Sequence, residues 1–533
     1  MRSARLTALV VLAGAIAGGL VLQAAEDPPS ATDEVVVVPV RAGVALPAAR
    51  PEPTLSSTWY CAGGSAAATP DDFADHVLLL ANPTDRARTA TITVLTGRVA
   101  PAAPPTPTTE QVEPTTTTAS APTSTAAPTP TTEVPAPTTR AVDLPAQGRV
   151  EVRLGDVSPA ELAGAVVEVD GGEIAVEHQV TGRLGRATAP CSTTASASWS
   201  FPWGVTERGA RELLVFMNPF PDDATVDIAF ATDEGTRDTA RFQGFVVPGR
   251  SVVGAYLDED VTRKAQVSAQ VRVRGGRLVI DRIQTFDGTD GREGITLALG
   301  VPVPALSWLY PVGDKSPGVT EQVVVYNPSE AVAEVEVEVR LDDPAVNTPP
   351  EPFELTVAPQ RYATVDVHAE DRVPAGVGHA LVVRSLNGVP IAAERVNTAM
   401  DPSPTRGVGV TSGSPFGAPT WYFPGGGPTP ERDEYLILLN LDNERPVTYS
   451  VTGFSKGQTL AIQNLQGQQI PAGGRVVLRL GTQIEREDLP VVVSADGAIV
   501  AERGLYRVGG GGISMSMGIP LARGIVVPDP IDG

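Results

Sequence analysis

The sequence predicts an all-β protein: an N-terminal transmembrane or signal helix, followed by four tandem immunoglobulin-like antiparallel β-sandwich modules. Three observations predict this class: a repeated tryptophan-to-asparagine pattern, tight turns between valine-rich runs, and steps of 109 and 113 residues between the later tryptophans. A length of 533 residues with 42% hydrophobic residues suits several folded domains rather than a disordered chain.

The tryptophan-to-asparagine pattern occurs four times. Each copy runs from a tryptophan through a Pro- or Gly-containing turn into an apolar strand that ends at an asparagine. The four pairs are Trp59 and Asn82, Trp199 and Asn218, Trp308 and Asn327, and Trp421 and Asn440. A recurring indole is typical of core packing, and an asparagine at a strand end is typical of a turn in which its side chain bonds nearby backbone. The alternative for the tryptophans is an aromatic platform for sugars, for which the non-repeating Trp203 is the best candidate.

The second half of each module ends in an adjacent acid–base pair. A valine-rich strand meets a Gly-Gly, Asn-Gly or Asp-Gly turn, which predicts a hairpin, and the next strand carries the pair. The four pairs are Glu177-His178, Asp281-Arg282, Glu394-Arg395 and Glu502-Arg503. Adjacent residues on a strand point to opposite faces, so we expect one member to form a structural cross-strand ion pair, for example with the arginine of a recurring turn, and the other to face solvent. Catalysis is the alternative reading.

These repeats place the domain boundaries. The predicted segments are a signal-anchor helix or signal peptide at 1–25, a linker at 26–54, module 1 at 55–193, module 2 at 194–303, module 3 at 304–416, module 4 at 417–527 and a tail at 528–533. Module 1 contains a Thr/Pro-rich insert at 98–141, whose composition predicts an extended, possibly O-glycosylated loop.

The N-terminus predicts export. Arg2 and Arg5 precede an uncharged apolar run at 6–25 that is long enough to span a bilayer as a helix. Cleavage after Ala25 would place Gln23 at a position where a small residue is preferred, which favours an uncleaved anchor over a signal peptide. Both alternatives place the rest of the chain outside the cytoplasm, either as a single-pass membrane protein or as a secreted one.

The two cysteines, Cys61 and Cys191, predict one disulfide in module 1, because an even pair in an oxidising compartment has no other partner. No metal, cofactor or catalytic site is predicted, since the four histidines lack metal-ligand spacing. The acids of Asp287-Gly288-Thr289-Asp290 could hold calcium, although a hairpin turn with solvated acids explains them as well. The formal net charge of −22 argues against a nucleic-acid partner.

The N-terminal anchor, the stretch Trp59-Tyr60-Cys61-Ala62-Gly63-Gly64 and the later modules together resemble an actinobacterial family of membrane-anchored or secreted proteins of unknown function. The resemblance implies an envelope location and brings no catalytic residues. We therefore expect a non-enzymatic, membrane-anchored scaffold or interaction stalk whose partners are envelope proteins or wall glycan. The alternatives are a cell-wall carbohydrate-binding protein and an enzyme with a site at a module junction.

Overall fold

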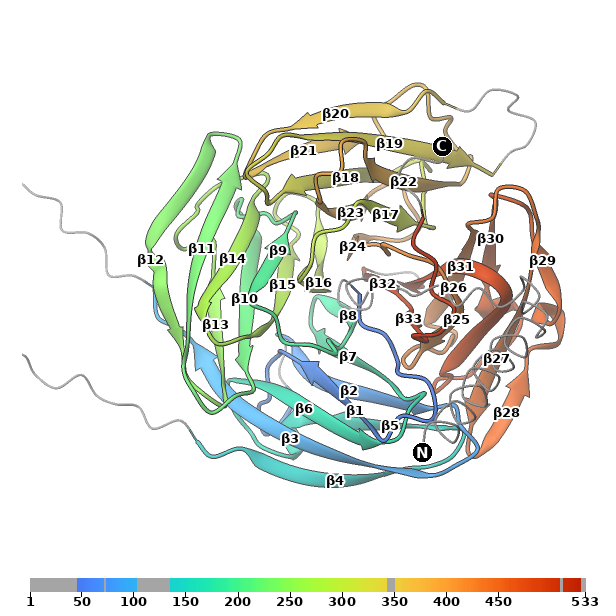
Figure 1. The fold of residues 1–533 in the computed structure, drawn as a ribbon, viewed down its shortest axis with the longest axis horizontal. Helices are drawn as coiled ribbons and strands as arrows, with labels where there is room; N and C mark the ends of the chain where they lie inside the picture. The colour runs from blue at the N-terminus through green and yellow to red at the C-terminus, as the bar shows by residue number, and fades with distance from the viewer. Residues whose placement is uncertain (1–45, 71–72, 103–134, 343–349, 509–510, 529–533) are drawn as a thin grey trace, which may run out of the picture. The chain divides into compact units, whose positions relative to one another are not determined.

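A computed structural model describes residues 46–70, 73–102, 135–342, 350–508 and 511–528, all within one compact unit, Val38–Gly533. The described residues form an all-β, sandwich-like structure of mostly antiparallel sheets with three single-turn 3-10 helices and no α-helix (Figure 1). The predicted helix at 1–25 and most of the insert lie outside the described residues. Within the described ranges, no helix is long and apolar enough to cross a membrane.

The strands recur in the same order in each module. Module 1 holds β1 (Ser56–Cys61), β2 (Asp75–Asn82), β3 (Arg88–Val99), β4 (Thr138–Leu144), β5 (Gly148–Arg153), η1 (Leu154–Asp156), β6 (Leu162–Asp170), β7 (Ala175–Gly182) and β8 (Gly185–Pro190). Module 2 holds β9 (Ser198–Phe201), β10 (Ala210–Asn218), β11 (Ala224–Thr232), β12 (Gly235–Val247), β13 (Ser251–Tyr256), β14 (Ser268–Gly275), β15 (Val279–Asp287) and β16 (Glu293–Leu299).

Modules 3 and 4 repeat the series. Module 3 holds β17 (Ser307–Tyr310), β18 (Val319–Asn327), β19 (Ala333–Leu341), β20 (Phe353–Val357), β21 (Arg361–Asp366), β22 (His379–Ser385), β23 (Ala392–Ala399) and β24 (Gly407–Thr411). Module 4 holds β25 (Ala418–Phe423), β26 (Arg432–Asn440), β27 (Val447–Ser455), β28 (Gln458–Ala461), η2 (Gln463–Leu465), β29 (Gln468–Ile470), β30 (Arg475–Arg479), η3 (Leu480–Thr482), β31 (Val491–Arg507), β32 (Ile513–Met517) and β33 (Ile519–Pro520).

Each module contains two layers of strands. In module 1 one layer has the order β1-β6-β3-β4 and the other β5-β2-β7-β8; modules 2 and 3 repeat this order, and in module 4 the long β31 pairs with strands of both layers. The first strand therefore pairs with the sixth, whereas in an immunoglobulin domain it pairs with the second. The immunoglobulin-like expectation is corrected on this point, because turn signals predict where strands begin and end but not which strands become neighbours.

The Gly-containing turns before the acid–base pairs are corners rather than hairpins. Gly171 and Gly276 have the positive φ expected of tight turns, 96° and 86°. However, β6 pairs with β1 and β3, whereas β7 pairs with β2 and β8, so the chain crosses from one layer to the other at this turn. In module 4 the predicted Asp496-Gly497 turn lies inside the continuous β31.

Burial differs between the two layers. In β19 of the first layer, Val335, Val337 and Val339 are buried and alternate with partly exposed glutamates, the period-2 pattern of a half-buried strand. In β2 and β23 of the second layer every residue is buried. The second layer is covered on both faces, and this places its polar residues inside the protein.

The modules contact one another in cyclic order. One strand of each module, namely the strand that follows the one carrying the acid–base pair, contacts its counterparts in both neighbouring modules: β8, β16, β24 and β32, including β32 with β8 (Figure 1). Leu46 and Pro47 cover the space between these four strands, which leaves a cavity of about 50 Å³. The sequence led us to expect a linear row of modules, but modules 4 and 1 are in direct contact.

The insert in module 1 is shorter than predicted. β3 runs to Val99 and β4 begins at Thr138, so both ends of the predicted 98–141 segment belong to paired strands. Threonine is β-branched and suits a strand once a partner is available.

Candidate functional site

The acid–base pairs lie at the contacts between modules, which we call seams. As expected from strand alternation, the two members of a pair point in opposite directions. Neither faces solvent, however: each acid reaches the preceding module in the cycle and each base reaches the following one. The expectation of one solvent-facing member was wrong because neighbouring modules cover the second layer.

Three seams contain a buried arginine–glutamate pair. Arg282 holds Glu394 in a two-pronged contact, with Nη1–Oε2 of 2.9 Å and Nη2–Oε1 of 3.0 Å. The other pairs are Arg395 with Glu502, at 2.5 and 3.2 Å, and Arg503 with Glu177, at 3.1 Å to both oxygens. All six side chains are fully buried. Paired, doubly hydrogen-bonded geometry is what allows such charges to remain inside a protein.

A loop residue four positions after each repeat tryptophan completes the three arginine seams. The backbone N–H donates to the glutamate, from Trp203 to Glu394 at 2.8 Å and from Gly425 to Glu177 at 2.8 Å. The carbonyl of the same residue accepts from the arginine. Val312 does both in the module 3–4 seam. One loop residue therefore satisfies both partners of an ion pair.

Trp203 is one of these loop residues, so its predicted exposure was wrong. Only 3% of Trp203 is exposed, and its ring lies 5.4 Å from the Arg282 guanidinium. The departure from the tryptophan repeat reflects packing against the arginine, a cation–π contact, rather than an outward platform.

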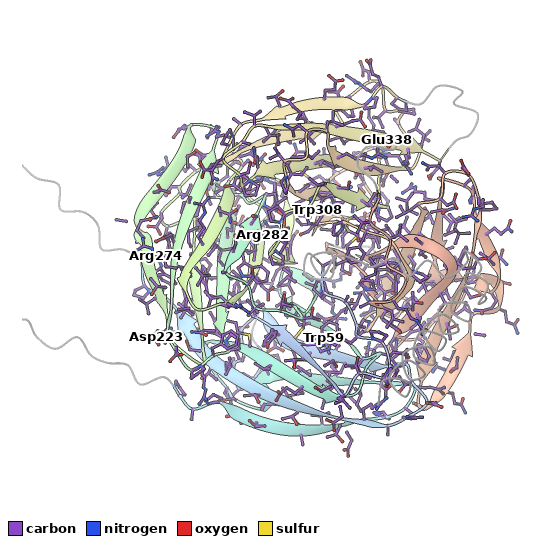
Figure 2. All side chains as sticks on the ribbon, in the orientation of Figure 1. Trp59, Asp223, Arg274, Arg282, Trp308 and Glu338 are labelled. Carbon is purple, nitrogen blue, oxygen red and sulfur yellow. A yellow bond between two sulfur atoms is a disulfide. The ribbon has the colours of Figure 1, made fainter. Side chains whose placement is uncertain are left out.

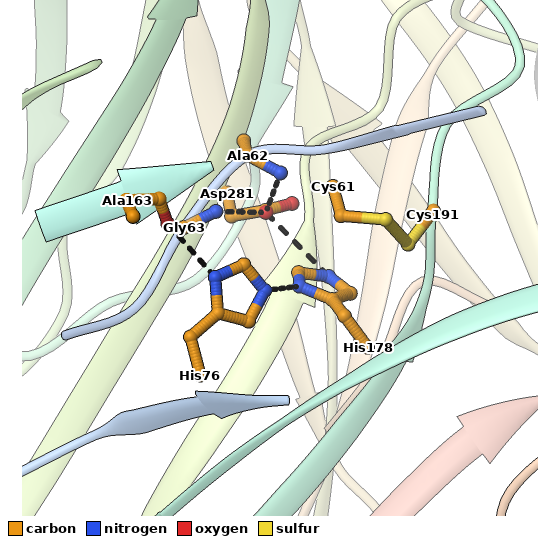
Figure 3. The surroundings of a disulfide bond; sticks show 8 residues. All are labelled: Cys61, Ala62, Gly63, His76, Ala163, His178, Cys191 and Asp281. Atoms are coloured by element: carbon orange, nitrogen blue, oxygen red, sulfur yellow. Dashed lines mark hydrogen bonds and ion pairs between the residues drawn. A yellow bond between two sulfur atoms is a disulfide. The ribbon is translucent and has the colours of Figure 1, made fainter. Parts of the chain in front are cut away.

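The module 1–2 seam contains histidines instead (Figure 3). His76 Nδ1 lies 2.8 Å from the Ala163 carbonyl oxygen, His76 Nε2 lies 3.0 Å from His178 Nδ1, and His178 Nε2 lies 3.5 Å from Asp281 Oδ2. Asp281 Oδ2 also accepts from the backbone N–H groups of Ala62 and Gly63, at 3.1 and 3.2 Å.

The hydrogen-bond partners show which ring nitrogens of His76 and His178 carry a hydrogen. A carbonyl can only accept, so His76 Nδ1 carries a hydrogen and His76 Nε2 accepts from His178 Nδ1. His178 Nε2 lies 3.5 Å from Asp281 Oδ2 without a hydrogen bond among the described residues, so the proton shared by these two groups is placed by the directions of their pKa shifts. Burial raises the pKa of Asp281 to about 8, against the opposing effect of the Ala62 and Gly63 N–H groups, and burial together with the neighbouring imidazole lowers the pKa of His178 well below its usual value. The pair therefore retains one proton and excludes a second.

Each seam has a third ionisable residue that the sequence reasoning missed. It lies six positions before the repeat asparagine: His76, Glu212, Glu321 or Glu434. Both Glu212 oxygens lack a hydrogen-bond partner among the described residues, and burial raises the Glu212 pKa to about 8. Burial also raises the pKa of Glu434. Glu321 contacts His379 at 2.7 Å and Arg395 at 3.8 Å. The constant spacing from the asparagine was a usable signal.

The repeat tryptophans and asparagines make their contacts within their own modules. The four repeat tryptophans are buried, and three donate Nε1–H to backbone carbonyls; Trp59 Nε1 has no partner among the described residues. Figure 2 labels Trp59 and Trp308. Asn82, Asn218, Asn327 and Asn440 each donate from Nδ2 to a carbonyl four or five residues on. Among the described residues, no ion pair joins the turn arginines to the acids of these pairs; Arg149 pairs with Glu151, and Arg475 bonds Asp342 of module 3. The other two turn arginines are Arg250 and Arg361.

The predicted disulfide is confirmed: Cys61 and Cys191 are bonded, across a sequence separation of 130 residues. At the candidate calcium turn, Asp287 accepts from the Thr289 N–H and Asp290 pairs with Arg292. No group of three or more potential metal-ligating side chains occurs in the part of the chain that the structure describes.

Residues 171–289 match a sequence family described as "Family of unknown function (DUF5719)". No curated protein matches the chain. Among solved structures, the chain is similar to Thermotoga maritima 1070, with 16% identity over 21% of this chain and 93% of that one and a TM-score of 0.18. It is also similar to the Anabaena sensory rhodopsin transducer, with 24% identity over 17% of this chain and 92% of that one and a TM-score of 0.15.

Proposed function

We propose that the chain is a non-enzymatic extracytoplasmic envelope protein that acts as a membrane-anchored scaffold for other envelope proteins. The observation that carries the proposal is the use of the acid–base groups: all four pairs are buried at seams and engaged with one another. Groups held in this way join neighbouring modules and are not free to act on a substrate. The apolar run at 6–25, preceded by two arginines, supports anchoring with the N-terminus inside.

The anchoring half of the proposal is tested by fractionation and protease treatment of intact native cells. We expect the full chain in the membrane fraction and its modules cleaved from outside, and a variant lacking residues 6–25 in the cytoplasm. The scaffolding half is tested by cross-linking in intact cells followed by identification of captured proteins. A cytoplasmic full-length protein, or cross-linking that yields no specific envelope protein, would overturn the respective half.

Carbohydrate binding is the second candidate function, and a groove between modules 3 and 4 favours it. The groove has a volume of about 750 Å³ and is lined by Tyr435 and Tyr506, whose rings pack edge to face at 5.4 Å. Val477 and Val508, about half exposed, line the same groove. Aromatic and aliphatic surface beside charged hydrogen-bonding groups suits the mixed polar and apolar faces of a sugar.

The ion pairs Arg479–Asp433 and Arg475–Asp342 supply the polar groups of this groove. The test is co-sedimentation with isolated wall polysaccharide. We expect Val508→Glu to reduce the bound fraction at least tenfold, whereas Leu386→Glu, at a similarly exposed residue away from the groove, leaves it unchanged. Equal binding by the two variants would remove the groove as the site.

A further inference from the structure

The module 1–2 seam differs from the other three by a coordinated replacement. The position six residues before the repeat asparagine is glutamate in modules 2 to 4 and histidine, His76, in module 1. The base is arginine in modules 2 to 4 and histidine, His178, in module 1. The acid facing His178 is Asp281, whereas the arginines face glutamates. A seam built on permanently charged guanidinium groups has thus been replaced by one whose charge depends on titratable rings.

The other charged groups on the strands around the histidine seam are paired, except Glu212, which has no hydrogen-bond partner among the described residues. On the strands packed around it, Asp75 of β2 bonds Arg153 of β5, Glu177 of β7 bonds Arg503, Arg282 of β15 bonds Glu394, and Glu212 of β10 lies near Arg282. Among the described residues, Asp281 is the carboxylate that contacts the two imidazoles. Within the described residues, the His76 ring has the Ala163 carbonyl and the other imidazole as its polar partners.

We propose that the module 1–2 seam is a proton-sensitive latch, closed when the His178–Asp281 pair holds one proton and His76 is neutral, and released when a further proton enters. The incoming proton would have to sit on His76 Nε2, which accepts from His178 in the closed seam. Its arrival breaks that hydrogen bond and places two donor rings against each other.

The sign of the effect follows from proton counting. In the open seam both imidazoles regain pKa values near 6.5. Below pH 6.5 the His178–Asp281 pair holds one proton whether open or closed, so it contributes no net pH dependence until Asp281 itself titrates. Burial lowers the pKa of His76 to about 4 in the closed seam. The open seam therefore binds one more proton between pH 6.5 and 4, and each unit of falling pH favours opening by about tenfold.

The backbone amides that donate to the seam carboxylates report opening directly. Ala62 and Gly63 donate in the histidine seam, and Trp203, Val312 and Gly425 donate at equivalent places in the arginine seams. The experiment is hydrogen exchange by mass spectrometry on the full chain at pH 6.5 and 4.5, with each rate divided by its intrinsic rate. We expect protection of the peptide spanning 60–66 to fall at least tenfold. Protection of the three equivalent peptides should not fall, because burial raises the pKa of Glu212, Glu434 and Glu502 and acid therefore favours the closed arginine seams.

The matched control installs the residues of the module 2–3 seam through the substitutions His76→Glu, His178→Arg and Asp281→Glu. This variant should lose the selective response of 60–66 to acid. Equal loss of protection at all four seams, or an unchanged 60–66 peptide in the wild-type protein, would overturn the proposal.

A second measurement does not depend on that variant folding. The ring 15N chemical shifts of His76 and His178 in the wild-type protein should show that the two imidazoles are not both cationic above about pH 5. Two imidazoles that both become cationic near pH 6.5 while 60–66 stays protected would overturn the latch.

Discussion

Arg282, Arg395 and Arg503 show how a single buried side chain can hold two modules together. Each contacts a glutamate of the next module and a loop carbonyl of its own module. A buried ion pair of this kind is not by itself a strong source of stability, because both charges lose their hydration. The energetic consequence appears when one partner is removed and the other charge remains buried.

We therefore expect Arg282→Gln to lower the free energy of unfolding by about 3–5 kcal/mol, because Glu394 is left buried without a counter-charge. The control is Arg274→Gln, whose arginine pairs with Asp227 on the exposed side of module 2 and should cost less than about 1 kcal/mol (Figure 2). Urea unfolding followed by tryptophan fluorescence measures both. Similar losses in the two variants would contradict this account of the seam.

The repeat tryptophans allow a second comparison between equivalent residues. Trp308 donates Nε1–H to the Ile391 carbonyl at 2.9 Å, whereas Trp59 Nε1 has no partner within the described ranges. Trp308→Phe removes one of the two hydrogen bonds that the Ile391 carbonyl accepts, the other coming from the Ala305 N–H, whereas Trp59→Phe removes a buried donor that is already unsatisfied. We expect Trp308→Phe to be more destabilising by about 1–3 kcal/mol, measured as the difference in urea unfolding free energy. A larger loss for Trp59→Phe would contradict the prediction.

At the scale of single residues, the sequence showed which residues recur in each module but not which residues they contact. The spacing located every acid–base pair, and strand alternation correctly gave opposite directions for its two members. It could not show that Glu177 meets Arg503, because the two residues are 326 positions apart and no local pattern links them. Trp203 was misjudged for the same reason: it is buried in a cluster with Val324 and Val396, which belong to another module.

At the scale of the elements, the strands were more predictable than their pairing. Glycines correctly located the turns at Gly171 and Gly276, although these turns are corners between layers and not the predicted hairpins. Pairing of the first strand with the sixth depends on how two layers pack, which turn chemistry does not encode. The full burial of the second layer could not be predicted either, because a strand covered on both faces shows no alternation of apolar and polar residues.

The disulfide is the element-scale feature with the clearest energetic consequence. It joins Cys61 at the end of β1 to Cys191 immediately after β8, and so ties the first layer of module 1 to the second. A closed loop spanning 130 residues restricts the unfolded chain strongly. The entropy argument gives a loss of about 4–5 kcal/mol for Cys61→Ala with Cys191→Ala.

Calorimetry of the double alanine variant measures that loss, and reduced wild-type protein is the control, because reduction breaks the same bond without changing the core. Intact mass should also rise by two hydrogens on reduction. A variant that unfolds at the wild-type temperature would show that the bond does not restrict the unfolded chain in this way.

At the scale of the whole described unit, the modules form a closed cycle of contacts and not a linear stalk, because the last module contacts the first. Modules 4 and 1 meet through Arg503, Glu177 and Gly425, and β32 bonds β8 through Ser514 and the Thr188 N–H. Removal of a terminal module from a linear row would leave the distant modules unchanged. In a closed cycle it exposes two seams at once.

The closing seam can be tested without truncation by a double-mutant cycle on Glu177→Gln and Arg503→Gln. Because the two side chains share one buried network, the double variant should be more stable than the sum of the single losses predicts, by about 1–3 kcal/mol. The control combines Arg503→Gln with Glu338→Gln. Glu338 lies on β19 in the first layer of module 3 and pairs with Arg340 and Arg384 (Figure 2). That combination should be additive within about 0.5 kcal/mol. Coupling between residues of the first and last modules arises only if the two modules meet in solution, so additivity in both cycles would mean that the ring of seams is open.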